Sequence, residues 1–217
     1  RSTLFPYTTL FRSRTGLSNM LGTTGGLPAD PNIFRSIGVE PIINCRGTFT
    51  IIGGSIERPE VRAAMEASSK DFVQYDELAD GIGKRLAELT GAEWGMVSAG
   101  CAAGMKHVTA ACVTGGNPEK LIRIPDLSGF EKTEVIIPRS SRNTYDHAIR
   151  NIGVKLITVE TLEELENAVS SRTAMIYLMA FSEAETDQQF TLEKIAAIAK
   201  PKNIPIMVDA AAEMLRF

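Results

Sequence analysis

The chain has 217 residues, of which 44% are hydrophobic and 23% charged, and its formal net charge is −3. This composition is ordinary for a globular protein, and the charge gives no electrostatic reason to expect a nucleic-acid partner. No apolar stretch reaches the roughly 20 residues of a membrane-spanning helix. Three cysteines without a CxxC spacing and two histidines argue against a disulfide scaffold or a structural metal site, and they favour a cytoplasmic location.

The beginning of the chain differs from the rest. Residues 1–13, RSTLFPYTTLFRS, have no period that continues into the following residues and look like a translated sequencing adapter, so we treat them as an artefact. Residues 14–32 are rich in Gly, Thr and Pro and predict a flexible lead-in. We expect one large domain over residues 33–217, and the artefact at one end favours an incomplete reading frame at the other.

Three helices are predicted in the first half of this domain. The stretch 58–72 has apolar residues at helical spacing after Pro59, which suits a first turn. The stretch 75–91 ends at Gly91 and gathers on one face Leu78, Ile82, Leu86 and Leu89. After a short apolar segment, EWGMVSAG, small residues predict a third helix from Cys101 to the glycine pair at Gly115.

Strands and helices alternate in the second half. Strands are predicted at 134–138, 154–159, 174–179 and 204–209, and helices at 143–153, 161–171 and 191–200. Thr161 and Glu164 have the spacing of a capping box at the start of one helix. Apolar strands separated by amphipathic helices predict a mostly parallel sheet between two helical layers, an α/β fold. Ligands of such sheets bind at the carboxyl ends of the strands.

Two features stand at such positions. In SAGCAAG (98–104), small residues at a predicted strand-to-helix junction would let backbone N–H groups approach an anion, although such residues more often serve only to pack a helix tightly against the sheet. Asp209 ends the last strand, where a carboxylate must be paired or solvated; it could instead cap a helix. Together the two features favour a ligand with a phosphate and a protonated ring, and pyridoxal 5′-phosphate fits that description.

From about Ile33 to Glu213 the chain resembles the selenocysteine-synthase-like branch of the fold-type-I pyridoxal-phosphate enzymes, within the aminotransferase class V group. The resemblance rests on GVEPIINCRGTFTIIGGS, LTGAEWGMVSAGCAAGMKHVTAAC, RNTYDHAIRNIG and IPIMVDAAAE, in that order. It implies the three-layer α/β/α large domain of a fold-type-I pyridoxal-phosphate-dependent transferase. It also implies pyridoxal phosphate as cofactor and a homodimer or higher homo-oligomer, because active sites of this family form between subunits.

The resemblance also implies positions that bind the cofactor. Gly100, Cys101 and Ala102 match the phosphate-binding turn, Asp209 matches the acid at the pyridine nitrogen, and Ala211 matches the small residue beneath the ring. Further cofactor positions are expected after two of the strands, namely Ser182 near the phenolic oxygen and Ser141 or Arg142 over the ring face.

Substrate positions are implied in the same way. Asn44 and Thr48 match a substrate-side loop of the family. Arg139 and Arg142 could grip a substrate carboxylate or phosphate, or remain solvated on the surface. His147 is expected on the helix that follows, where it packs or faces solvent.

The chain departs from the family in one respect. These enzymes hold the cofactor as a Schiff base on a lysine some tens of residues beyond the strand-end Asp. Here AAAEMLRF follows Asp209 and contains no lysine, and Lys106 is expected to be solvated. We therefore expect an N-terminal fragment that contains no catalytic residue, with the Schiff-base lysine beyond Phe217.

Three functions remain open. The preferred one is a pyridoxal-phosphate-dependent lyase or transferase that acts on an amino acid or amino-sugar acid, by α-proton abstraction and β-elimination or replacement. The second is L-seryl-tRNA(Sec) selenium transferase, but we expect no tRNA partner because the chain has neither a domain before the core nor a basic surplus. The third is a non-catalytic scaffold. A dinucleotide-binding module is disfavoured because no glycine fingerprint follows the first strand.

Overall fold

The computed structural model describes residues 32–48, 52–180 and 189–211. The chain forms two compact units, Arg1–Asp71 and Phe72–Phe217, so the domain predicted over 33–217 spans parts of both. The adapter-like residues 1–13, the lead-in up to residue 31 and Ser182 lie outside the described residues. Within the described ranges, no helix has the length and apolarity needed to cross a membrane.

The first unit contains the short 3₁₀ helix η2 (Arg35–Ile37) and helix α2 (Pro59–Ser68). Helix α2 begins at Pro59 as predicted, because the missing N–H of proline is not needed in a first turn. Between these elements, Asn44 closes a tight turn: its side chain donates to the carbonyl of Gly47 (2.8 Å) and accepts from the N–H of Arg46 (2.9 Å).

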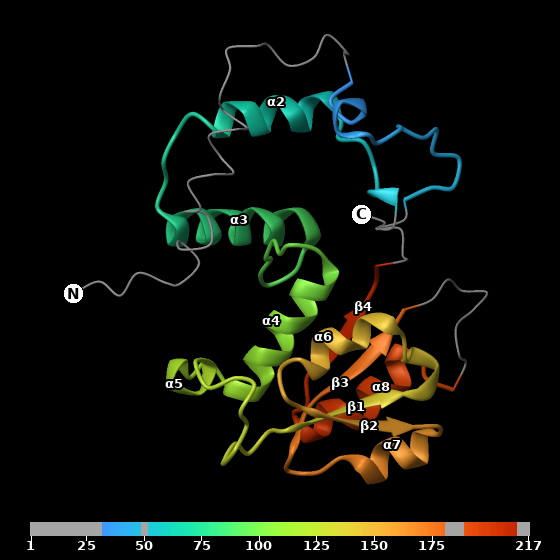
Figure 1. Cartoon of the computed structure of the whole chain (residues 1–217). Helices are drawn as coiled ribbons and strands as arrows, with labels where there is room; N and C mark the ends of the chain where they lie inside the picture. Colours follow the sequence, from blue (N-terminus) through green and yellow to red (C-terminus); the bar gives the residue numbers. More distant parts are fainter. Residues whose placement is uncertain (1–31, 49–51, 181–188, 212–217) are drawn as a thin grey trace, which may run out of the picture. The chain divides into compact units, whose positions relative to one another are not determined.

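The second unit is built on a four-stranded parallel sheet (Figure 1). Its strands are β1 (Glu134–Pro138), β2 (Lys155–Val159), β3 (Thr173–Met179) and β4 (Ile206–Asp209), in the order β2-β1-β3-β4. All three pairings are parallel, which confirms the predicted sheet. The chain adds β2 on one side of β1 and then β3 on the other side, so the direction in which strands are added reverses between β1 and β3. Open α/β sheets bind ligands at such a point.

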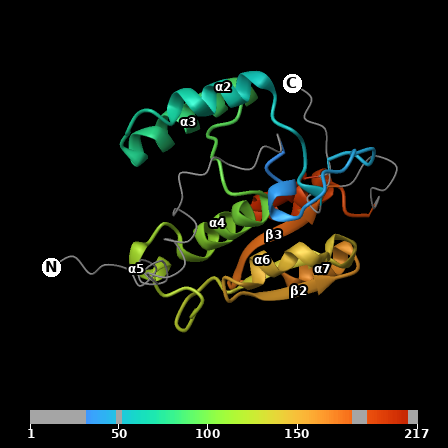
Figure 2. The ribbon, with the colours of Figure 1, turned by 45° about the horizontal axis from the view of Figure 1, so that its top comes forward.

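Helices cover both faces of this sheet. Helix α4 (Cys101–Thr114) runs beside β3 (Figure 2) and shares one hydrophobic cluster with α6 (His147–Arg150). Helices α7 (Leu162–Ala168) and α8 (Leu192–Ala199) share the cluster on the other face. The alternation along β1 sends Ile137 into the first cluster and Ile136 into the second, and both are fully buried. The second unit therefore has the predicted three layers.

The remaining elements of the second unit are short, apart from one long helix. These elements are α3 (Tyr75–Thr90), α5 (Pro118–Leu121), and the 3₁₀ helices η4 (Arg139–Ser141), η5 (Thr144–Asp146) and η6 (Lys200–Lys202). Helix α3 ends at Gly91 as predicted, but Leu78 and Leu89 on its apolar face are 44% and 55% exposed. Periodicity predicted the face of this helix, whereas burial depends on a neighbour that periodicity does not identify.

Two local predictions need correction. No strand forms in residues 93–100, so the turn before α4 follows an irregular segment rather than a strand. The capping box of α7 is only half formed. Thr161 accepts from the N–H of Glu164 (3.0 Å), but the Glu164 carboxylate accepts from the N–H of Glu160 (2.7 Å), one residue earlier than the pattern requires.

Candidate functional site

Asp209 is the last residue of β4 and lies opposite Met179 at the carboxyl edge of the sheet. The alternation of side chains places it on the α4 face, together with Tyr177 of β3. The N–H of Ala180 donates to the Asp209 carbonyl (2.9 Å) and extends the pairing by one residue. Only 6% of Asp209 is exposed, so its carboxylate depends on protein donors rather than on water.

Three donors surround the Asp209 carboxylate. The thiol of Cys101 (3.2 Å) and the N–H of Ala211 (3.1 Å) donate to Oδ1, and the hydroxyl of Tyr177 donates to Oδ2 (3.1 Å). All three neighbours donate, which is the pattern that suits an ionised carboxylate, an acceptor only. Each carboxylate oxygen has about two acceptor positions. Among the described residues the donors fill both positions on Oδ1 and one on Oδ2, so Oδ2 can accept one more hydrogen bond.

The start of α4 lies next to this carboxylate. Gly100, the N-cap, has φ 89° and ψ 170°, a conformation that an L side chain rarely adopts. Gly104 is the residue whose N–H bonds back to the Gly100 carbonyl (3.1 Å), so the N–H groups of residues 101–103 have no acceptor within the helix. A Cβ atom placed on Gly100 would meet nothing within 4 Å, so the turn faces open space. The structure thus brings the predicted anion-binding turn and the predicted carboxylate together.

The environment of the site raises the pKa of two of its donors. Burial, followed by the hydrogen bond to Asp209 and its negative charge, raises the pKa of the Cys101 thiol to about 11. Burial also raises the pKa of the Tyr177 phenol well above its usual value, and the Asp209 charge adds to this rise, while the hydrogen bond from Asn143 opposes it. Because each pKa is raised, both groups stay protonated and can donate to Asp209 up to a higher pH than usual.

The predicted arginines are occupied by carboxylates of this chain. Arg142 pairs with the buried Asp146 and also donates to the hydroxyl of Thr158 (3.1 Å). Arg139 pairs with Glu160 at 2.6 Å on the surface. The described contacts of both guanidinium groups are thus away from Asp209, and a ligand would have to compete with these carboxylates for them. Their proposed roles in binding the cofactor or substrate remain predictions.

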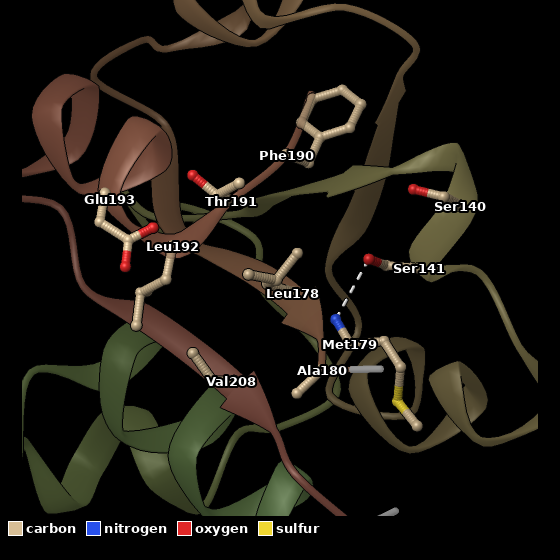
Figure 3. A pocket seen from close by; sticks show the side chains of 10 residues that line it. All are labelled: Ser140, Ser141, Leu178, Met179, Ala180, Phe190, Thr191, Leu192, Glu193 and Val208. Atoms are coloured by element: carbon tan, nitrogen blue, oxygen red, sulfur yellow. Dashed lines mark hydrogen bonds between the residues drawn. The ribbon is translucent and has the colours of Figure 1, made fainter. Parts of the chain in front are cut away.

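Other predicted residues lie in varied places. The buried hydroxyl of Ser141 accepts from the N–H of Met179 at 3.1 Å, and so completes the end of β3 (Figure 3). His147 lies exposed on α6, as predicted, with its ring 2.8 Å from the Thr144 carbonyl. Lys106 is exposed on α4, also as predicted. The other two predicted substrate residues, Asn44 and Thr48, belong to the first unit.

A pocket of about 300 Å³ lies on the opposite face of the sheet from the Asp209 carboxylate. It is lined by Leu178 and Val208, which alternate with Tyr177 and Asp209 along their strands, and by residues 190–193 at the start of α8 (Figure 3). The pocket is mainly apolar where these strands line it. The arrangement of donors and acceptors that can recognise a charged ring is therefore on the α4 face, outside this pocket.

The sequence interpretation missed two residues of the site, Tyr177 and Asn143. Tyr177 is fully buried, and its hydroxyl bonds both to Asp209 and to the side-chain amide of Asn143 (3.3 Å). A hydroxyl-bearing residue in the otherwise aliphatic strand AMIYLM was a usable signal, because a buried Tyr normally finds a hydrogen-bond partner.

No protein-family profile matches the chain. The chain is 30% identical over 192 residues to D-glucosaminate-6-phosphate ammonia lyase of Salmonella typhimurium, which covers 84% of this chain and 52% of that protein. It is 29% identical over 191 residues to 5′-C-glycyluridine monooxygenase-decarboxylase of a Streptomyces species, covering 83% and 48%. The chain thus spans about half the length of these curated relatives.

The solved structure of D-glucosaminate-6-phosphate ammonia-lyase superposes with a TM-score of 0.78 at 30% identity, over 85% of this chain and 52% of that chain. A TM-score of this size indicates that the two chains share a fold over the aligned part. The described part of the chain therefore has the fold predicted from its sequence, the α/β fold of the large domain of fold-type-I pyridoxal-phosphate enzymes.

Proposed function

We propose that the protein is a pyridoxal-phosphate-dependent lyase that acts on an amino acid or amino-sugar acid. In this reaction class the Cα–H bond breaks, and the electron pair it leaves behind later forms a Cα–Cβ double bond as the β-substituent departs with its own pair. The cofactor supplies the electron sink for this chemistry when it is bound. The selenocysteine-synthase-like branch, a homo-oligomeric assembly and a cytoplasmic location belong to the same proposal.

The observation that carries the proposal is the pairing of Asp209 with the start of α4. Among the described residues, Oδ2 has one acceptor position that no donor fills, and the N–H groups at the helix start have no acceptor within the helix. The Cys101–Asp209 hydrogen bond of 3.2 Å joins these two features. The cofactor has two matching groups, an anionic phosphate and a ring nitrogen that can carry a proton. The residues present therefore fit the cofactor: residues 100–102 would bind the phosphate, and Asp209 would hold the proton on the ring nitrogen.

The choice of substrate class draws on the relatives. One relative is named for a phosphorylated amino-sugar acid, glucosaminate 6-phosphate, and for the release of ammonia. The other is named a monooxygenase-decarboxylase of 5′-C-glycyluridine, so proteins similar to this chain are named for more than one reaction. Both names describe small-molecule substrates, and the net charge of −3 offers nothing to hold a tRNA. We therefore favour a small-molecule lyase over selenium transfer to a seryl-tRNA and over a non-catalytic scaffold.

The proposal is tested by titrating the full-length protein with pyridoxal phosphate. We expect saturable binding, measured by calorimetry and visible absorbance. Asp209→Asn should weaken the binding of pyridoxal phosphate about tenfold or more, because a hydrogen bond between opposite charges is lost. Ammonia release from phosphorylated amino-sugar acids then tests the reaction class.

Asp80→Asn is the matched control. Asp80 lies exposed on α3 and pairs with Lys84 there, so its replacement should leave cofactor binding unchanged. Absence of saturable binding by the wild-type protein, or equal binding by wild type and Asp209→Asn, would contradict the proposal.

A further inference from the structure

Four side chains form one continuous hydrogen-bonded chain at the carboxyl edge of the sheet. Asn143 donates to the Tyr177 hydroxyl (3.3 Å), Tyr177 donates to Oδ2 of Asp209 (3.1 Å), and Cys101 donates to Oδ1 (3.2 Å). Asn143 follows β1, whereas Tyr177 is part of β3. The first link of this chain therefore spans the point where the strand order reverses.

The backbone of η5 sets the direction of these hydrogen bonds. Oδ1 of Asn143 accepts from the N–H of Tyr145 at 2.7 Å, which identifies the atom that faces Tyr177 as the amide nitrogen, a donor. The Tyr177 oxygen is then an acceptor toward Asn143, and its own hydrogen must point elsewhere. In the part of the chain that the structure describes, its acceptors are Oδ2 of Asp209 (3.1 Å) and the sulfur of Met179 (3.6 Å). A carboxylate is far the stronger acceptor, so the hydrogen points at Asp209.

Among the donors of the described residues, none fills the second acceptor position of this same oxygen, Oδ2. Tyr177 is fully buried on β3, which lies between β1 and β4, so close packing supports the position of its hydroxyl and of the oxygen that it contacts. We propose that Tyr177, oriented by Asn143, is a positioning residue that holds Oδ2 of Asp209 toward the protonated ring nitrogen of the bound cofactor. This inference rests on the proposed function, because it assigns a ligand to Oδ2.

The first test compares Tyr177→Phe with the wild type, using two ligands. One is pyridoxal phosphate, and the other is its analogue with a carbon atom in place of the ring nitrogen, which has no N–H to donate. We expect Tyr177→Phe to weaken binding of pyridoxal phosphate about tenfold, the usual effect of a hydrogen bond to a charged group, and to leave the Kd of the analogue unchanged. Tyr75→Phe, at an exposed position on α3, is the control.

The second test removes only the donor that orients Tyr177. Asn143→Ser keeps a residue that can cap η5, but its side chain is too short to reach the Tyr177 hydroxyl. We expect about threefold weaker binding of pyridoxal phosphate, and no further weakening when Asn143→Ser is added to Tyr177→Phe, because Asn143 acts through that hydroxyl. Asn117→Ser is the matched control, since Asn117 caps α5 in the same way at an exposed site.

Each result decides between the two proposals. If Tyr177→Phe weakens the binding of both ligands equally, or of neither, the positioning role is wrong. The proposed function would still stand in that case, provided that the wild-type protein binds pyridoxal phosphate and that this binding depends on Asp209. If the effects of Tyr177→Phe and Asn143→Ser on the binding of pyridoxal phosphate were additive, the role of Asn143 would also be wrong. If the wild-type protein binds neither ligand, both proposals fail. Should Tyr177→Phe not fold, the comparison of Asn143→Ser with wild type on the two ligands makes the same distinction.

Discussion

Asp209 shows how a carboxylate can remain at the nearly buried end of a strand. Each hydrogen bond to a charged group contributes about 1.5–3 kcal/mol, so three donors can replace much of the hydration that burial removes. The three donors come from separate parts of the chain: Cys101 begins α4, Tyr177 lies in β3, and Ala211 follows β4. The carboxylate therefore links these parts, and its removal should change the hydrogen bonding of each of the three donors.

The Cys101 thiol reports on this link. In a chain whose other cysteines are replaced (Cys45→Ser, Cys112→Ala), we expect Asp209→Asn to lower the pKa of Cys101 from about 11, because the negative charge and its hydrogen bond are removed. Burial, the largest cause of the raised pKa, persists, so the pKa should stay above the ordinary 9.0. The rate of alkylation by iodoacetamide at pH 9 should rise several-fold. An unchanged rate would show that Asp209 does not act on the thiol.

The same pKa predicts how stability depends on pH. The folded-state pKa of Cys101 is raised to about 11 from 9.0, so its contribution is complete below pH 9 and is lost as the pH rises through 11. Tyr177, whose pKa is also raised, acts in the same direction at still higher pH. The urea midpoint of unfolding should fall between pH 9 and 11, and it should fall less in Cys101→Ser, whose hydroxyl does not ionise in this range.

At the scale of elements, the start of α4 depends on one backbone conformation. We expect Gly100→Ala to destabilise the protein by about 1–3 kcal/mol, because φ 89° strains any L side chain even though the space around it is open. The substitution should also weaken phosphate binding at the turn. Urea unfolding and the titration with pyridoxal phosphate measure the two effects.

Gly81→Ala gives the matched comparison for this strain. Gly81 also has open space around it, but it lies within α3 with an ordinary helical φ. Alanine should there stabilise the protein by about 0.5–1 kcal/mol, since it lowers the entropy of the unfolded chain. If both substitutions shifted the urea midpoint in the same direction, backbone strain would not be the property that distinguishes Gly100.

Most elements could be predicted because their causes are local. Short continuous apolar runs predicted β1–β4, and capping residues such as Thr161 and Gly91 predicted the ends of helices. Asp209 and the turn at Gly100 were found because a strand-end carboxylate and a run of small residues are visible in one segment. Tyr177 and Asn143 were missed because their roles depend on which strands are neighbours, and strand order is a long-range property that no single segment contains.

At the scale of the whole second unit, the sheet is covered by helices on both faces. Substitutions of two adjacent residues of one strand can test the packing of each face separately. Ile136 and Ile137 are both fully buried but point into different hydrophobic clusters. We expect Ile136→Ala and Ile137→Ala each to cost about 2–5 kcal/mol of stability, since each leaves a cavity in a packed layer. Urea unfolding measures both.

Ile122→Ala is the control for these two substitutions, because Ile122 is 84% exposed and its replacement should change stability by about 0.5 kcal/mol or less. If either buried substitution were as mild as this control, the corresponding face of the sheet would not be packed. Large losses from both substitutions are the result expected of a sheet that is packed on each face.

The hydrogen bond between Cys101 and Asp209 joins residues that are 108 positions apart in the chain. Ribosomes add about 5–20 residues per second, so the turn at Gly100 emerges about 5–20 s before the strand that carries the carboxylate. During that interval β1, β2 and β3 can pair with one another, but the site cannot exist. Any capacity to bind a charged ring at Asp209 therefore arises only when β4 docks against β3, and a nascent chain stalled before residue 206 should lack it.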